Sequence, residues 1–214
     1  IIEAAETLTA SAANSLLKFL EEPAQNVYAI LCTSNKNQML PTILSRLQVI
    51  DLAALAPQMV QQQFEAAGIL PQQAQLLVHL TSDLAEAQTL LADDWLLQVS
   101  AKLAACAQKV EQRDLEAFVQ IQTQILPLLV DRQQQKTFLT LVGLWYQDLL
   151  NYRYELGATP CFGAYESQLN QASAVLTTTQ LVAQTEYALQ AQRIFEQNIS
   201  CQNVLESLTL KLIA

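Results

Sequence analysis

The segment that decides the fold of the first part of the chain runs from Asn14 to Pro23 and reads NSLLKFLEEP. Its leucines, together with Ala13, recur at three- and four-residue spacing, which is typical of one face of a helix. Thr9 can cap the start of this helix with its hydroxyl. Pro23 predicts the end of the helix after Glu22, because proline cannot continue a helix.

The residues that follow predict an α/β arrangement. The run 27–33, VYAILCT, is apolar, rich in strand-forming residues and too short for a typical helix, so it predicts a buried strand of a parallel sheet. Pro41 suits the first turn of a short helix through Arg46. The run 48–52, QVIDL, predicts a second strand.

Beyond Pro57 the pattern becomes almost entirely helical. We predict helices over about 58–67, 72–80, 83–91, 94–109, 114–127, 133–154, 164–174, 178–198 and 201–213. The predicted fold class is therefore mainly α, with an α/β remnant at the start and an all-helical remainder. We expect one face of the predicted helix 133–154 to form the core of a helix bundle. That face consists of Phe138, Val142, Trp145, Leu149 and Tyr152.

Composition excludes several classes of function. The chain has 214 residues, 51% of them hydrophobic, and its 11 Lys and Arg against 20 Asp and Glu give a net charge of −9. This charge argues against a protein that holds DNA by itself through a basic surface. No apolar stretch approaches the roughly 20 residues that a membrane-spanning helix needs, so we expect no membrane partner. The opening residues contain no initiator Met or secretory signal, and we expect a fragment of a longer protein in the cytoplasm.

The sequence offers no complete catalytic or cofactor site of its own. Its four glycines do not form a phosphate-binding loop, and its four cysteines form no C-x-x-C pair, so we expect neither a cofactor nor a metal. The single histidine, His79, lies in an apolar helical run, which favours packing over a hydrolase triad. Trp145 can in principle belong to a cofactor site, although its spacing favours the bundle core.

A second sequence motif, read together with the NSLLKFLEEP segment, points to a protein family. The segment 40–46 reads LPTILSR and follows the NSLLKFLEEP segment after the predicted strand. The two segments resemble the N-x-L-L-K-x-L-E-E-P and L-P-T-I-x-S-R-C motifs of the AAA+ clamp-loader subunits. The resemblance is strong over about 50 residues and extends weakly through 144–150 and 203–208 to nearly the whole chain.

The resemblance implies domains and a site. It implies a partial AAA+ core at 1–54, a helical lid at 55–96 and a helical collar domain for oligomerisation at 97–214. It also implies that Arg46 is an arginine finger that reaches the ATP of a neighbouring subunit, with Ser45 supporting the turn. A guanidinium suits this task because it stays charged and presents a planar fork of donors to phosphate oxygens. The alternative interpretation of Arg46, without a functional role, is a surface ion pair at a helix end.

Departures from the family pattern indicate which kind of subunit this is. Leu47 stands where the motif has cysteine, and the opening residues lack the paired acids of an active motor. The segment 81–87 falls where motor subunits carry a sensor arginine, and it offers Glu86 nearby instead. They point to a subunit that is no enzyme by itself and serves a neighbour's ATPase.

The implied partners are motor subunits of the γ/τ type and a δ subunit, with a sliding clamp and primed DNA reached through the complex. The last helix should then provide oligomer contacts, with Leu205, Leu208 and Leu212 as candidates beside plain packing. Two other functions remain open: a motor-type clamp-loader ATPase subunit, and a helical protein-interaction adaptor unrelated to replication.

Overall fold

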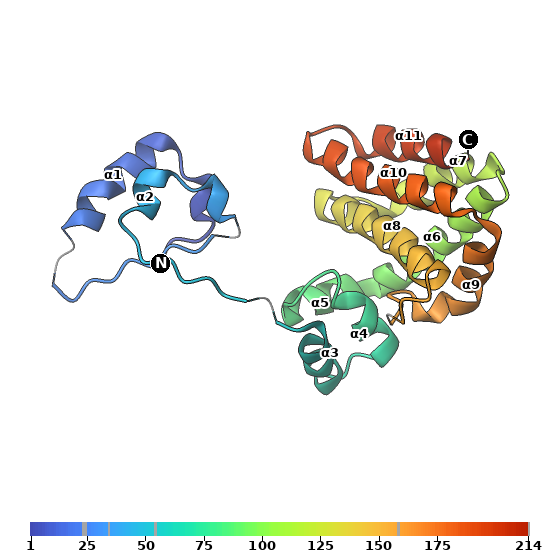
Figure 1. Cartoon of the computed structure of the whole chain (residues 1–214), viewed down its shortest axis with the longest axis horizontal. Helices are drawn as coiled ribbons and strands as arrows, with labels where there is room; N and C mark the ends of the chain where they lie inside the picture. Colours follow the sequence, from blue (N-terminus) through green and yellow to red (C-terminus); the bar gives the residue numbers. More distant parts are fainter. Residues whose placement is uncertain (23–24, 34, 54, 158, 214) are drawn as a thin grey trace. The chain divides into compact units, whose positions relative to one another are not determined.

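A computed structural model of the chain describes residues 1–22, 25–33, 35–53, 55–157 and 159–213. The chain divides into two compact units, Ile1–Ala54 and Leu55–Ala214 (Figure 1). The helix stop expected at Pro23 lies outside the described residues. Within the second unit, the division into a lid at 55–96 and a collar at 97–214 stays a prediction.

The first unit contains short helices joined by extended segments. They are the 3-10 turn η1 (Ala5–Thr7), α1 (Ala10–Glu21), the 3-10 turn η2 (Lys36–Gln38) and α2 (Pro41–Leu44). The Thr9 hydroxyl accepts a hydrogen bond from the backbone N–H of Ala12 at 3.2 Å, so it caps α1 as expected. Pro41 occupies the first turn of α2, where a missing N–H costs nothing.

The two sequence motifs pack against each other in the first unit. Its buried side chains are Ala5, Ala13, Met39 and Ile43, and leucines of both motifs pack around them: Leu17, Leu20, Leu40 and Leu44. The helical spacing in NSLLKFLEEP therefore reflects a small core that α1 shares with α2. This packing positions the residues that follow α2.

The two predicted strands do not form a sheet in the described part of the chain. Only one parallel bridge is present there, between Ile2 and Leu31, with Ile2 N–H donating to the Ile30 carbonyl and Cys32 N–H to the Ile2 carbonyl, both at 2.8 Å. The run 48–52 takes part in no strand pairing among the described residues. A parallel strand exists only where neighbours complete its hydrogen-bond ladder. The strand prediction was therefore wrong for this chain, although mainly α is confirmed as its class.

The second unit is helical throughout its regular elements. They are α3 (Pro57–Ala66), α4 (Pro71–Leu77), α5 (Leu84–Leu91), η3 (Ala92–Asp94), α6 (Trp95–Glu111), α7 (Glu116–Gln120), η4 (Ile121–Ile125), η5 (Leu126–Leu128), α8 (Arg132–Arg153), η6 (Gly163–Tyr165), α9 (Glu166–Val175), α10 (Thr178–Glu196) and α11 (Cys201–Ile213). These helices agree with the predicted ones to within a few residues, with two exceptions.

Both exceptions concern how far a helix continues. The helix predicted over 114–127 is broken into α7, a π-helical turn at η4 and a 3-10 turn at η5. Pro127 explains the break, because it lacks an N–H and its ring clashes with the carbonyl four residues earlier. The helix predicted over 72–80 ends at Leu77, so His79 lies in the turn after α4.

The long helix α8 is central to the second unit (Figure 1). It packs against α9 and α10, and α10 packs in turn against α11. Phe138, Trp145 and Leu149 of α8 are completely buried, which confirms the predicted core face. Trp145 stacks edge-on against Phe162 with 5.3 Å between ring centroids, so the core interpretation of Trp145 holds.

Candidate functional site

The predicted finger residue lies at the surface of the first unit. Arg46 follows the last turn of α2, and its backbone N–H bonds the Ile43 carbonyl at 3.0 Å. Because Ile43 is buried in the small core, the backbone of Arg46 is fixed while its side chain, 33% exposed, remains accessible to solvent. Position 46 therefore presents a charged group outward from a packed support.

The Arg46 guanidinium is held by an acid from the first motif. Its Nε and Nη2 lie 2.6 and 2.5 Å from the same oxygen of Glu21, Oε1. Its Nη1 donates to the Thr42 carbonyl at 2.9 Å and to the Ser45 hydroxyl at 3.3 Å. The surface ion pair, which we considered as the alternative to an arginine-finger role, is thus formed in this structure.

Ser45 supports this arrangement directly. Its hydroxyl donates to the Thr42 carbonyl at 3.1 Å and accepts from Arg46 Nη1. The structure therefore brings both predicted site residues together with Glu21, an acid that the sequence suggested only as a solvated charge at a helix end. The signal for Glu21 was its place at the end of the NSLLKFLEEP motif, where α1 meets α2.

The ion pair is compatible with a mobile guanidinium. Glu21 is half exposed and Arg46 is one third exposed, and exposed ion pairs contribute only about 0–1 kcal/mol. Releasing Glu21 would therefore cost little, and it would free a planar fork of N–H donors for phosphate oxygens. The geometry can serve an anion supplied by another molecule.

The other chemical groups of the chain do not form an active centre in the described residues. No group of three or more His, Cys, Asp or Glu side chains is arranged there to hold a metal ion. Cys106, Cys161 and Cys201 are buried, and burial raises the pKa of these thiols to about 11, about 12 and about 11. They therefore stay protonated and unreactive at neutral pH. Nor does any helix among these residues combine the length and apolarity needed to cross a membrane.

The structure shows one buried acid whose role sequence reasoning missed. Asp148 of α8 is fully buried, and its two carboxylate oxygens accept hydrogen bonds from the backbone N–H groups of Cys161 and Phe162, at 3.0 and 2.8 Å. Burial raises the pKa of Asp148, and these two bonds oppose that rise. A signal was available, because Asp148 shares the apolar face of α8 with Trp145 and Tyr152.

His79 interacts electrostatically with the same acid. Burial lowers the pKa of His79, and the nearby charge of Asp148 partly reverses this effect. Neighbouring Gln75 of α4 donates a hydrogen bond to the Pro160 carbonyl. Together these groups fasten the segment 160–162 between α4 and α8, which is a structural role.

The leucines proposed as oligomer contacts are mostly engaged within the second unit. Leu205 and Leu208 are 1% and 5% exposed, so intradomain packing accounts for them. Leu212 is half-buried and packs against the same core. The large apolar side chains that α10 and α11 do expose are Val182, Leu189 and Leu210.

Comparison with known proteins gives a consistent family. Residues 1–56 match the family model described as DNA polymerase III, delta subunit. The chain is 32% identical to the DNA polymerase III subunit delta' of Bacillus subtilis over 99% of this chain and 64% of that protein. It thus spans less than two thirds of that relative's length.

Two further relatives match a shorter part of the chain. Over 52 residues, or 24% of this chain, it is 48% identical to the subunit delta' of Haemophilus influenzae, covering 16% of that protein. Over another 52-residue match it is 52% identical to an uncharacterized protein of Mycoplasma pneumoniae, the MG007 homolog, covering 21% of it. The family-model match over residues 1–56 and the 32% identity across nearly the whole chain make it similar to DNA polymerase III delta' subunits.

Proposed function

We propose that this chain acts in DNA replication as part of a δ' subunit of a cytoplasmic clamp loader, and that it contributes Arg46 to the ATP site of a neighbouring motor subunit. The subunit does not hydrolyse ATP itself. Its similarity to a named delta' subunit over 99% of its length supports the assignment. The observation that carries the role of Arg46 is a one-third-exposed guanidinium supported from beneath by the packed motif core.

In the proposed mechanism, the weak ion pair between Glu21 and Arg46 keeps the Arg46 side chain in place until a neighbouring subunit docks. In the isolated subunit Glu21 orients the Arg46 side chain at the surface. When a neighbour with bound ATP docks, the more highly charged phosphates compete with the single carboxylate for the guanidinium. Arg46 then stabilises the charge that develops on the transferring phosphoryl group. Ser45 keeps the turn in place through its bond to the Thr42 carbonyl.

The partners in this proposal are γ/τ-type motor subunits and a δ subunit, and the assembled loader opens a sliding clamp at primed DNA. Exposed apolar side chains on the last helices are suited to contacts with those subunits. Val182 and Leu189 of α10 are seven residues apart and therefore share one helix face.

The experiment compares Arg46→Ala and Arg46→Lys with the unchanged protein in a reconstituted loader from full-length subunits. We expect both variants to assemble normally, measured by size-exclusion chromatography with light scattering. ATP hydrolysis at the neighbouring site should fall, because arginine fingers contribute on the order of 10³-fold or more to phosphoryl transfer. Lysine should not rescue it, since an ammonium lacks the planar fork.

Glu21→Gln is the matched control. It removes the same ion pair as Arg46→Ala but leaves the guanidinium in place. If Arg46 acts in trans, Glu21→Gln should preserve ATP hydrolysis. Equal losses in Glu21→Gln and Arg46→Ala would mean that the ion pair matters only for structure, and the finger role would be rejected.

A further inference from the structure

A pocket of about 330 Å³ lies in the second unit, and its lining includes no residue of the two motifs. The end of α6 forms one wall through Glu111, the first half of α10 forms another through Gln184, and the end of α11 closes it through Leu212. Apolar side chains such as Val175 and Leu176 line much of the remainder. Such a pocket with a few convergent polar atoms is the usual form of a binding site.

Two buried oxygen atoms of residues that line the pocket lack a hydrogen-bond donor. Within the described residues, neither Glu111 Oε1 nor Gln184 Oε1 accepts a hydrogen bond. Gln184 is only 8% exposed, and its Nε2 donates to the Leu212 carbonyl at 3.4 Å. That bond fixes which end of the amide carries the oxygen, since a flipped amide would bring two acceptors together. Buried acceptors without a donor are costly, so the pocket favours a ligand rich in N–H groups.

The burial of Glu111 makes the site responsive to a cation. Burial raises the pKa of Glu111 to about 7, and the neighbouring Tyr146 is fully buried and uncharged at neutral pH. A positively charged donor would stabilise the ionised carboxylate and restore a lower pKa. The carboxylate is thus poised to gain from a cationic partner.

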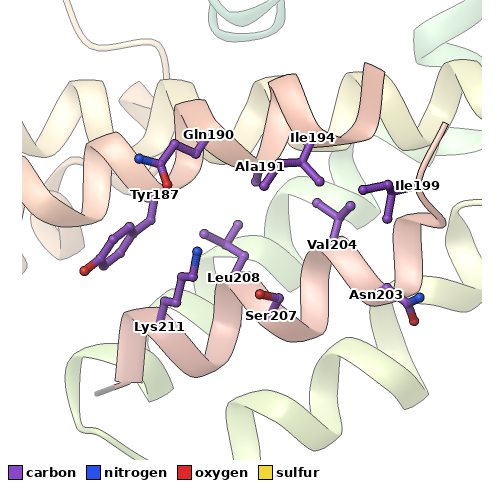
Figure 2. A pocket seen from close by; sticks show the side chains of 10 residues that line it. All are labelled: Tyr187, Gln190, Ala191, Ile194, Ile199, Asn203, Val204, Ser207, Leu208 and Lys211. Carbon is purple, nitrogen blue, oxygen red and sulfur yellow. The ribbon is translucent and has the colours of Figure 1, made fainter. Parts of the chain in front are cut away.

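Two cations of the chain itself, Lys211 and Arg113, also line the pocket. Lys211 lies with its Nζ 5.5 Å from the centroid of the Tyr187 ring, and both side chains also line a neighbouring groove of about 190 Å³ between α10 and α11 (Figure 2). In that view Lys211 extends from α11 toward α10 beside Tyr187. Arg113, the other basic residue lining the pocket, is exposed and follows the end of α6. An ion pair between Glu111 and either cation is absent from the described part of the chain.

We propose that this pocket receives an arginine side chain of a partner protein, whose guanidinium donates hydrogen bonds to Glu111 Oε1 and Gln184 Oε1. Arginine fits this pair of acceptors because its five N–H donors are held in one plane and its apolar stem suits apolar walls. An anion is disfavoured by the two acceptor oxygens. This site is independent of the role proposed for Arg46.

The test uses the full-length protein with N-acetylarginine amide as the probe and N-acetylcitrulline amide as its neutral isostere. The titration of the Glu111 carboxyl carbon is followed by NMR after ¹³C-labelling of glutamate. We expect saturating N-acetylarginine amide to lower the titration midpoint of Glu111 by about one pH unit or more, and the citrulline compound to leave it unchanged. The arginine amide should bind about tenfold more weakly at about pH 6 than at about pH 8, because the protonated carboxyl no longer attracts the cation.

Variants of the pocket residues establish where the probe binds. Glu111→Gln and Gln184→Leu should each weaken binding of the arginine amide several-fold, whereas Glu186→Gln on the exposed face of α10 should not. The proposal is overturned if the two probes act alike or if Glu111→Gln leaves the affinity unchanged. It is also overturned if Arg113→Ala or Lys211→Ala alone raises the midpoint of Glu111, because the occupant would then be the chain's own cation.

Discussion

At the scale of single residues, the chain contrasts an acid that acts at the surface with one that acts in the core. Glu21 contributes little to stability because water screens its pair with Arg46. Asp148 is fully buried and satisfies two backbone N–H groups that would otherwise lack acceptors. The solvent-exposed carboxylate of Glu21 therefore has little effect on stability. The buried carboxylate of Asp148 instead determines the path of the segment 160–162.

Asp148→Asn should therefore destabilise the second unit. The amide keeps one acceptor oxygen but turns an NH₂ group toward the other backbone N–H, which loses its partner. We expect a loss of about 1–3 kcal/mol in the free energy of unfolding. The value should lie toward the lower end, because burial already raises the pKa of Asp148 and the neutral amide avoids burying a charge. Urea unfolding measures it.

Asp93→Asn is the control for this change. Asp93 is exposed and has a positive φ of 54°, which asparagine adopts readily. It should change the free energy of unfolding by less than about 0.5 kcal/mol. If the two variants unfold at the same urea concentration, the carboxylate of Asp148 does not hold the segment 160–162.

Sequence reasoning found the residues of the first unit better than those of the second. Arg46 and Ser45 belong to a contiguous motif, so a short stretch of sequence identifies them. Asp148 accepts hydrogen bonds from the N–H groups of Cys161 and Phe162 further along the chain, and Glu111 lines a pocket together with Gln184 of another helix. Their roles depend on tertiary packing, which a local pattern does not encode.

At the scale of elements, the helices were predictable and the strands were not. A helix such as α8 makes its hydrogen bonds within itself, and its apolar spacing marks it in the sequence. A strand such as 27–33 depends on neighbours, and here only Ile2 pairs with it in the described residues. The end of α7 was missed because Pro127 acts on the carbonyls before it.

The start of α8 shows how local chemistry fixes an element. The Asp131 carboxylate accepts from Gln134 N–H at 2.7 Å, and the Gln134 side chain accepts in return from the N–H of Asp131 at 3.4 Å. Asp131→Ala should cost about 1 kcal/mol of unfolding free energy by removing this cap. Asp131→Asn should restore most of the loss in the same urea experiment. Equal losses for the two variants would show that the cap is not responsible.

At the scale of the whole molecule, the two units differ greatly in the size of their cores. The buried apolar side chains described in the first unit are Ala5, Ala13, Met39 and Ile43, whereas the second unit buries large ones such as Phe64 and Trp145 completely. The first unit also exposes Tyr28, Ile50 and Leu52 by 88%, 73% and 90%. Small domains that bury little of their apolar surface are marginally stable by themselves.

Hydrogen exchange on the 214-residue chain should therefore separate the units. Amides of α1 should exchange on the order of 100-fold or more faster than amides in the middle of α8, because few buried contacts oppose the opening of α1. In the first unit, the best protected amides should be those of Ile2 and Cys32, which bond across the parallel bridge at 2.8 Å. Mass spectrometry of exchanged peptides measures both rates in one sample, with α8 as the internal reference. Equal protection of α1 and α8 would contradict this account, since it would require a stabilising contribution in the first unit much larger than the small core around Ile43 supplies.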